Sequence, residues 1–343
     1  MKQQKQKTWP SKFETPRFTA LPFVKKHPTR PDPGGPKNNS SNPPPFPDPC
    51  DDYHRCHQDY SHLPYDVLMK IAATFSWTHL RTASLVCKSW NDALRPLRDA
   101  MVFLRWGKRF KHGRGGVKPN SAKALDCFLK GAARGSTLAM VDAGLLYWEM
   151  GRKEEGIAWY SKAAQLGDPT GQCNLGICYL QGETPNSQQA VKWLYKASVA
   201  GHVRAQYQLA LCFHQGRGGV HKNFQEAAKW YLKAAEGGYV RAMYNTSLCY
   251  SFGEGLMQSH RLGRKWMKRA ADRGHSKAQF DHGLSLFSEG DMMKAVVYLE
   301  LATRAGERAA NHVKNVVLQQ LSTSSRDRAM LVVDNWRALP STR

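Results

Sequence analysis

The chain has 343 residues, of which 50 are Lys or Arg and 27 are Asp or Glu, so its formal net charge is +23. With 41% apolar residues it is too apolar to be disordered throughout. No uncharged apolar run approaches the roughly 18 residues of a membrane helix, and no N-terminal apolar stretch marks a secretory signal. We therefore expect no membrane association, and we expect the protein in the cytoplasm and/or the nucleus.

The eight cysteines are scattered along the chain, and most of them fall inside apolar helical patterns rather than in loops. This distribution favours free thiols in a reducing compartment over a disulfide framework.

Residues 1–58 have the composition of a disordered, proline-rich tail. Twelve of the 18 prolines precede residue 50, and a segment of this kind buries too little apolar surface to offset its ordering entropy. A proline run at residues 43–47 would suit a polyproline-binding groove.

Four soft ligands follow the proline run, namely Cys50, His54, Cys56 and His57. Their spacing fits no standard zinc module, so we expect neither a metal site nor any other cofactor.

Residues 59–104 predict a small domain of about three helices. Apolar side chains share one helical face between Val67 and Phe75, and Pro64 suits the first turn of that helix. A second apolar set runs from Leu80 to Leu94. Because so small a unit buries little surface by itself, we expect its apolar residues to complete their packing on a partner.

This segment resembles an F-box, because it begins with Leu-Pro-x-Asp-Val-Leu and ends with Leu-Val-Cys-Lys-x-Trp at the appropriate distance. The resemblance implies docking on the Skp adaptor of a cullin-based ubiquitin ligase. The residues expected to make this contact are Leu63, Pro64, Val67, Leu68, Ile71, Leu80, Leu85, Val86, Cys87 and Trp90. Exposure to solvent would be costly, unless a partner covers them, for seven of these: Leu63, Pro64, Leu68, Ile71, Leu80, Leu85 and Trp90. The alternative is a generic three-helix linker domain.

A basic linker is expected at 105–118, helical repeats at 119–315, and a C-terminal helix or tail at 316–343. The repeats are marked by one glycine per copy, at Gly135, Gly167, Gly201, Gly238, Gly274 and Gly306. Small residues stand eleven and four positions before each marker, and a large one eight before, as Ala190, Ala197 and Trp193 do before Gly201. These spacings are helical, and the glycine is expected to end the helix.

Each unit is thus a helix pair too thin to bury its own apolar face, so successive pairs must stack. The pattern from Ala205 to Gly237 resembles Sel-one-like repeats, relatives of the tetratricopeptide repeat. The sequence predicts an all-α protein: a disordered tail, a small F-box, and an α-solenoid of about five to six repeats. An F-box followed by such repeats resembles a plant F-box protein.

The repeat accounts for several residues that would otherwise suggest chemistry. Cys178, Cys212 and Cys249 share one repeat position, which indicates small buried side chains rather than nucleophiles or metal ligands. The tryptophans eight before each marker likewise predict core positions. Basic residues recur five before the marker and are expected to point away from the tryptophan face. They form either a solvated surface or a surface for an acidic partner.

By analogy with tetratricopeptide repeats, the other helix of each pair lines a groove. The residues expected to bind a target there are Arg204, Tyr207, Arg241, Tyr244, Lys277 and Phe280. Contact with the adjacent repeat is an equally good account of these positions.

No catalytic constellation stands apart from the repeat, so we do not expect an enzyme. The sequence predicts the substrate-recognition subunit of a Skp–cullin–F-box ubiquitin ligase, which would hold an unidentified target protein near the ubiquitin-charged enzyme. A scaffold outside the ligase and a basic nucleic-acid-associated solenoid are the alternatives, although we do not expect nucleic acid as a partner.

Overall fold

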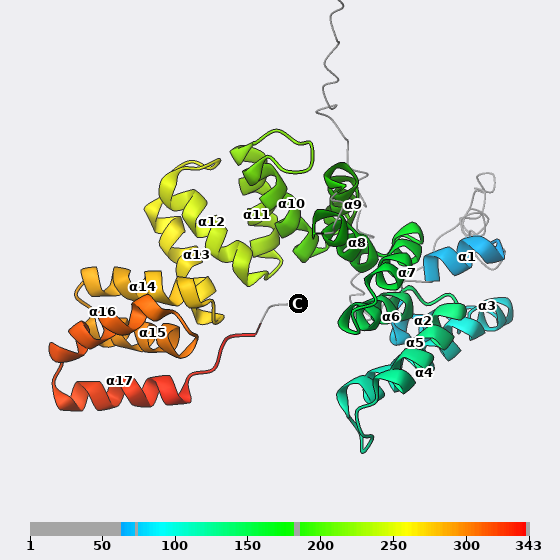
Figure 1. Ribbon diagram of the computed structural model, residues 1–343, viewed down its shortest axis with the longest axis horizontal. Helices are drawn as coiled ribbons and strands as arrows, with labels where there is room; N and C mark the ends of the chain where they lie inside the picture. Colours follow the sequence, from blue (N-terminus) through cyan, green and yellow to red (C-terminus); the bar gives the residue numbers. More distant parts are fainter. Residues whose placement is uncertain (1–62, 73–74, 182–185, 341–343) are drawn as a thin grey trace, which may run out of the picture. The chain divides into compact units, whose positions relative to one another are not determined.

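The computed structural model describes residues 63–72, 75–181 and 186–340, all within the unit Asp59–Arg343. These residues form seventeen helices and no strand, which confirms the predicted all-α class (Figure 1). The predicted tail, its proline run and the Cys/His cluster lie outside the described residues.

The F-box segment is built from three short helices and one long one. They are α1 (Tyr65–Ala72), α2 (Trp77–Ala83), α3 (Lys88–Ala93) and α4 (Arg95–His112). The hydroxyl of Ser76 caps α2 by accepting a hydrogen bond from the His79 amide. Leu68, Leu80 and Leu94 are almost fully buried and form the small core that holds the four helices together.

Helix α4 differs from the expectation of a basic linker at 105–118. Its apolar residues continue at helical spacing from Leu97 to Leu104, and the helix ends only at Gly113, which has a φ of +64°. Helix α4 packs on α5 (Ser121–Ala133) and α6 (Thr137–Glu149). It is therefore shared: its first turns complete the F-box, and the whole helix pairs with α5 at the start of the repeat stack.

The remaining helices continue this arrangement in chain order. They are α7 (Lys153–Gln165), α8 (Pro169–Gln181), α9 (Ser187–Val199), α10 (Val203–Gln215), α11 (Phe224–Glu236), α12 (Val240–Phe252), α13 (His260–Asp272), α14 (Ser276–Ser288), α15 (Met292–Arg304), α16 (Arg308–Gln319) and α17 (Thr323–Asn335). From α4 to α16 each helix packs on the next, most extensively within the pairs α6/α7, α8/α9, α10/α11, α12/α13 and α14/α15. This is the predicted stack of helix pairs.

Every marker glycine is the second residue after the end of a helix and has a positive φ, which is +85° at Gly201. The next residue, His202, donates its backbone N–H to the carbonyl of Ala197 at 3.0 Å, which closes the helix with a Schellman-type bond. Equivalent bonds occur after the other markers, for example from Tyr239 to Ala234. The glycine therefore turns the chain sharply enough for the next helix to begin two residues later.

Small residues let the two helices of a pair approach closely. A Cβ atom on Gly176 of α8 would lie 2.8 Å from Leu194 Cγ of α9 and 3.2 Å from the carbonyl oxygen of Ala190. Ala190, eleven before its marker, is fully buried. The repeated small residues are thus explained by backbone packing rather than by chemistry.

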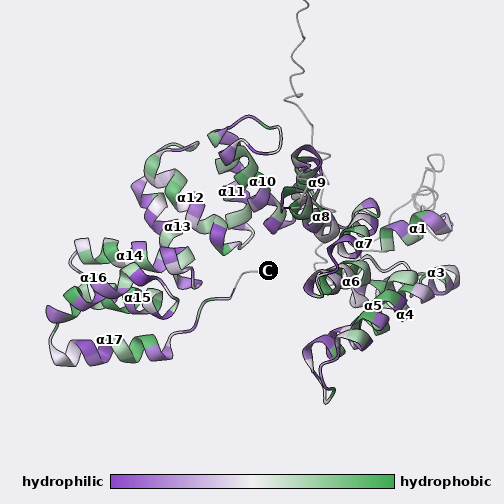
Figure 2. Cartoon of the chain, in the orientation of Figure 1, coloured by the Kyte–Doolittle hydropathy of each residue, from purple (hydrophilic) through white to green (hydrophobic). Residues whose placement is uncertain are grey.

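The C-terminal end of the stack is covered by α17, which packs on α15. Its inner face contributes Ala329 and Val333, both almost fully buried, while Leu331 and Val332 are exposed. Beyond the helix, the backbone N–H of Leu339 donates to the carbonyl of Asp272 at 2.9 Å. Figure 2 shows apolar and polar residues alternating along the helices, as one buried face per helix requires.

Candidate functional site

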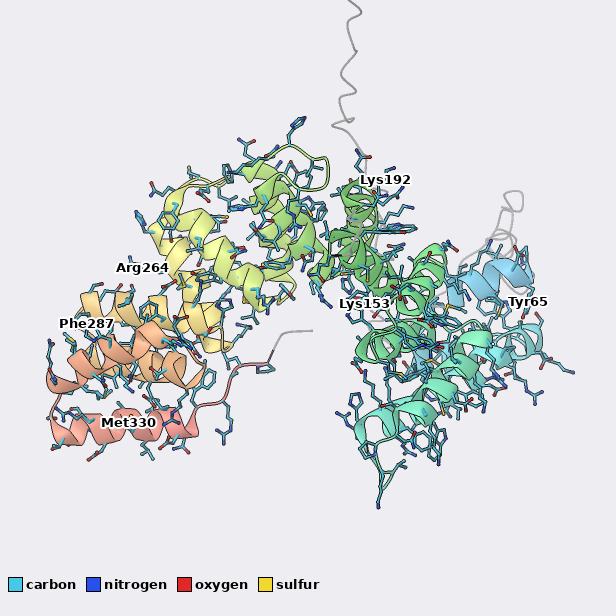
Figure 3. The ribbon with its side chains drawn as sticks, viewed as in Figure 1. Tyr65, Lys153, Lys192, Arg264, Phe287 and Met330 are labelled. Atoms are coloured by element: carbon cyan, nitrogen blue, oxygen red, sulfur yellow. The ribbon has the colours of Figure 1, made fainter. Side chains whose placement is uncertain are left out.

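The F-box presents a dense set of exposed apolar side chains. Their exposed fractions are 59% for Tyr65, 37% for Val67, 49% for Ile71, 78% for Leu85 and 57% for Val86. Figure 3 shows Tyr65 on α1. Leu85 and Val86 lie in the turn between α2 and α3, where their amides bond back to the carbonyls of Thr82 and Ala83. Exposed apolar groups concentrated in so few residues are typical of a protein-binding surface.

Two residues expected on this surface belong elsewhere. Leu68 is 3% exposed and Leu80 is 1% exposed, because both point into the F-box core. Trp90 and Cys87 are half-buried, and the Trp90 ring packs against the same core. Leu63 is half-buried, and Pro64 is exposed. The prediction that Leu68 and Leu80 are exposed was wrong, because helical periodicity does not say which apolar residues a small domain keeps for itself.

The predicted groove positions separate into two kinds. Arg204, Arg241 and Lys277 are exposed and lie in the first turns of α10, α12 and α14. None of the three forms an ion pair with another described residue. They are therefore available to a ligand.

The aromatic members of the predicted set are instead used between repeats. The Tyr207 ring lies 5.9 Å from that of Tyr231 and 5.0 Å from that of Tyr239. Tyr244 stacks on His275 at 4.7 Å and donates its hydroxyl to Asp281 at 3.0 Å. Phe280 packs against the C-terminal core. For these rings the structure favours the alternative, contact with the adjacent repeat.

The basic residues that stand five positions before a marker glycine lie on the other helix of each pair. They do not point away from the tryptophans, contrary to the prediction. The Lys162, Lys196 and Lys233 ammonium groups lie 4.3, 4.5 and 4.4 Å from the ring centroids of the tryptophans three residues earlier. Arg269 sits over Trp266 in the same way, at 4.7 Å. Side chains three residues apart share a helix face, so each cation lies over the tryptophan ring of its own helix. Two of these rings, Trp159 and Trp193, are half-buried, and the other two, Trp230 and Trp266, are buried.

The cysteines of the repeat are buried, as expected. Cys178, Cys212 and Cys249 are at most 6% exposed, and burial raises the pKa of each thiol to about 11. Such thiols carry almost no thiolate at neutral pH and are poor nucleophiles and metal ligands. Among the described residues no three His, Cys, Asp or Glu side chains are grouped so that they could hold a metal ion.

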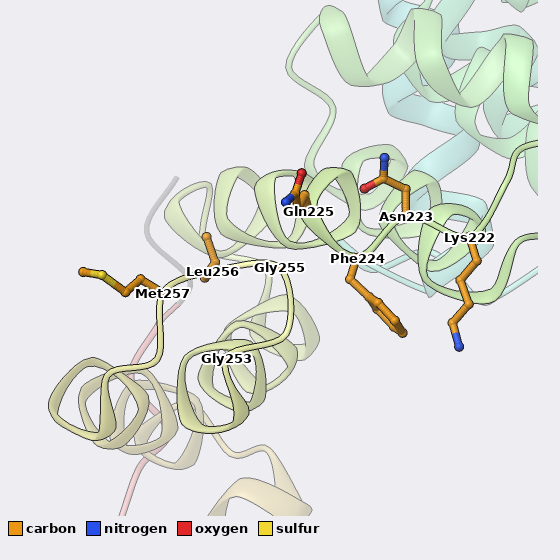
Figure 4. A pocket seen from close by; sticks show the side chains of 8 residues that line it. All are labelled: Lys222, Asn223, Phe224, Gln225, Gly253, Gly255, Leu256 and Met257. Atoms are coloured by element: carbon orange, nitrogen blue, oxygen red, sulfur yellow. The ribbon is translucent and has the colours of Figure 1, made fainter.

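A hollow with a volume of about 590 Å³ lies between two loops, one entering α11 and one following α12. Figure 4 shows Lys222, Phe224, Leu256 and Met257 along its edges. Met257 is 89% exposed, and Lys222 is the only charged residue in the lining. This hollow therefore lacks the convergent polar groups of a catalytic site.

In the described part of the chain, no helix is long and apolar enough to cross a membrane.

The geometry thus defines a helical-repeat protein whose first helices carry an exposed apolar surface. Comparison with known families agrees: the F-box domain matches residues 60–98, and the Sel1 repeat matches 104–136, 152–168, 169–202, 203–239, 240–275 and 276–307. The chain belongs to the F-box proteins that carry Sel1 repeats. The match that begins at 104 overlaps α4, in agreement with its shared role.

The chain is similar to the F-box protein At1g70590 of Arabidopsis thaliana, with 58% identity over 99% of this chain and 100% of that protein. Among solved structures, the Sel1 repeat protein from Oxalobacter formigenes is 25% identical, with a TM-score of 0.57 over 67% of this chain and 98% of that one. The antigen c5321 of uropathogenic Escherichia coli is 21% identical, with a TM-score of 0.44, and the match covers 73% of this chain and 63% of that chain. The predicted resemblance to a plant F-box protein is confirmed.

Proposed function

We propose that the protein is the substrate-recognition subunit of a Skp–cullin–F-box ubiquitin ligase. The F-box docks on the Skp adaptor, and the repeats bind a target protein and hold it near the ubiquitin-charged enzyme. This role requires a high effective concentration of the target near the ubiquitin-charged enzyme, and it requires no catalytic residues in this chain. Family membership supports the adaptor organisation, and we expect the protein to act in the cytoplasm and/or the nucleus.

The observation that carries the proposal is the exposed turn at Leu85 and Val86. These two side chains are 78% and 57% exposed, while Leu80 and Leu94 on either side of the turn are buried. Apolar residues at the centre of an interface supply most of its binding energy. The proposed adaptor surface therefore consists of this turn together with Pro64, Val67 and Ile71, with Leu63, Cys87 and Trp90 at its half-buried edge and Leu68 and Leu80 as the core beneath it.

The test is a titration of the full chain against a purified Skp adaptor by isothermal calorimetry. The Leu85→Ser/Val86→Ser variant should bind at least about 30-fold more weakly, the effect of losing about 2 kcal/mol of interface anchoring. The matched control is Leu331→Ser/Val332→Ser, because the same residue pair is 62% and 51% exposed on α17. This control should bind like the wild type. Equal binding by all three proteins, or none by the wild type, contradicts the proposal.

Two other functions give different outcomes. A scaffold that works outside the ligase would bind the adaptor without supporting ubiquitination of a bound partner in a reconstituted assay. A nucleic-acid-associated solenoid would bind RNA or DNA with an affinity that falls steeply with salt. The net charge of +23 motivates the second alternative.

A further inference from the structure

The repeats carry two rows of basic residues, and only one of them is explained by helix stability. In the outer row, Lys162, Lys196, Lys233 and Arg269 stand in the last turn of α7, α9, α11 and α13. A cation in the last turn interacts favourably with the helix dipole. Each of these cations also covers a tryptophan ring. The outer row therefore has a structural role that needs no ligand.

The groove row has the opposite relation to its helices. Arg204, Arg241 and Lys277 stand in the first turn of α10, α12 and α14, where the helix dipole disfavours positive charge, and no acidic residue shares that turn. Lys277 interacts electrostatically with Asp281, whereas Arg204 and Arg241 form no ion pair with an acidic residue in the described part of the chain. Three consecutive repeats thus place a cation where it costs local stability.

Cations of two neighbouring repeats lie close enough to affect the pKa of the same histidine. Burial lowers the pKa of His275 below its usual value, and Arg241 of α12 and Lys277 of α14 lower it further. Burial and Arg204 do the same to the pKa of His202. Arg241 and Lys277, which belong to successive repeats, therefore both lie near His275, and Arg204 lies near the equivalent His202 of the preceding repeat.

Polar amides continue the same face. Gln208 and Asn245 stand four residues after Arg204 and Arg241, one helical turn further on, and Asn174 holds the equivalent position on α8. All three amides are half-buried, and on α14 the equivalent position, four residues after Lys277, is the half-buried acid Asp281. Asn245 already hydrogen-bonds to the hydroxyl of Tyr207. An amide both donates and accepts hydrogen bonds, which matches the N–H and C=O groups of an extended main chain.

We propose that this face, the cation–amide groove of Arg204, Arg241, Lys277, Asn174, Gln208 and Asn245, binds an extended acidic segment of the target protein. The cations pair with its carboxylates, and the amides bond its main chain. The inference rests on the proposed function and names the class of target that it selects.

The test uses the full chain and a fluorescein-labelled decapeptide of alternating Glu and Ser, with binding followed by fluorescence anisotropy at 150 mM salt. The groove variant Arg204→Ser/Arg241→Ser/Lys277→Ser should bind the peptide at least tenfold more weakly than the wild type. The matched control, Lys192→Ser/Lys229→Ser/Lys265→Ser, removes three exposed charges from α9, α11 and α13, which carry the outer row, as Lys192 on α9 illustrates in Figure 3. It should lose less than twofold.

Equal losses in the two variants would overturn the inference, because binding would then depend on net charge alone. So would the absence of saturable peptide binding by the wild type. Tighter binding of a twelve-residue oligothymidine, lost in the groove variant, would assign the face to nucleic acid instead. The Skp titration is run on the same proteins. Adaptor binding without peptide binding overturns the groove and leaves the proposed function intact, whereas peptide binding without adaptor binding does the reverse.

Discussion

At the scale of single residues, Gly201 shows how the absence of a side chain at one position lets a helix end there. Its φ is +85°, and a Cβ atom added there would meet nothing within 4 Å. Any cost of substitution is therefore conformational rather than steric, since L-residues with a side chain avoid this left-handed region. The equivalent glycines of the other repeats share the same conformation, with φ between +84° and +92°.

We expect Gly201→Ala to lower the free energy of unfolding by about 1–2 kcal/mol, the cost of holding alanine in the left-handed region. Gly201→Asn should lose less, because Asn tolerates this conformation better. Urea unfolding followed by circular dichroism measures both. Equal losses for Ala and Asn would show that the site requires glycine for a reason other than φ.

At the scale of elements, two helices begin at a histidine that must be neutral. The Nδ1 atom of His202 accepts a hydrogen bond from the Ala205 amide at 3.2 Å, and His275 caps α14 by the same bond to Ala278. A protonated imidazole has no acceptor nitrogen. Burial and neighbouring cations lower the pKa of both histidines, so the folded protein favours the state that can cap.

This cap predicts a pH dependence of stability. Below its ordinary pKa of about 6.5 each histidine binds a proton in the unfolded chain but not yet in the folded one, so stability falls as the pH falls through that value. The variant His202→Asn/His275→Asn, whose amide oxygens cap at any pH, should lose less stability between pH 7.5 and pH 5.5. Urea midpoints at the two pH values measure the difference. His282 has a lowered pKa as well, so some pH dependence of stability should remain in the double variant.

An unchanged slope in the double variant would show that the two caps do not titrate in this range. The single variants provide the internal control, because each should remove only part of the slope.

At the scale of the whole molecule, stability is a sum over neighbouring helix pairs, since each pair packs mainly on the next. The last pair needs a cover, and α17 supplies it with Val333, which is 3% exposed. Damage at this end should therefore stay local. The F-box lies at the other end of the chain of contacts and should keep its adaptor surface.

We expect Val333→Asp to release α17 and expose α15, because a carboxylate without a partner is costly to bury. Limited proteolysis should then cut the chain within α16 or α17, while binding to the Skp adaptor is retained. The control is Val332→Asp, because Val332 is its neighbour in sequence and is 51% exposed. Cleavage of the two variants at the same rate would contradict the assignment of α17 as the cover.

The organisation of the chain follows from local rules and could be predicted. Helical spacing, the chirality that confines positive φ to glycine, and the repetition of both identified the marker glycines and the buried cysteines, whereas the F-box was identified by the resemblance of its motif to a known family. Each of these depends on a few neighbouring residues and on a pattern seen in several copies. A repeat also averages over the irregularities of any single copy, which makes the prediction robust.

Exposure depended on tertiary contacts and could not be predicted in the same way. The F-box resemblance placed Leu68 and Leu85 together among the adaptor-binding residues, but Leu68 enters the core and Leu85 faces solvent. The tetratricopeptide analogy placed Tyr207 with Arg204, although Tyr207 packs on the adjacent repeat. The sequence alone determined the helices of the repeats and the glycines that end them, because those are local properties. Only the tertiary structure decided which side chains a partner can reach, because that depends on the helix that lies across each face.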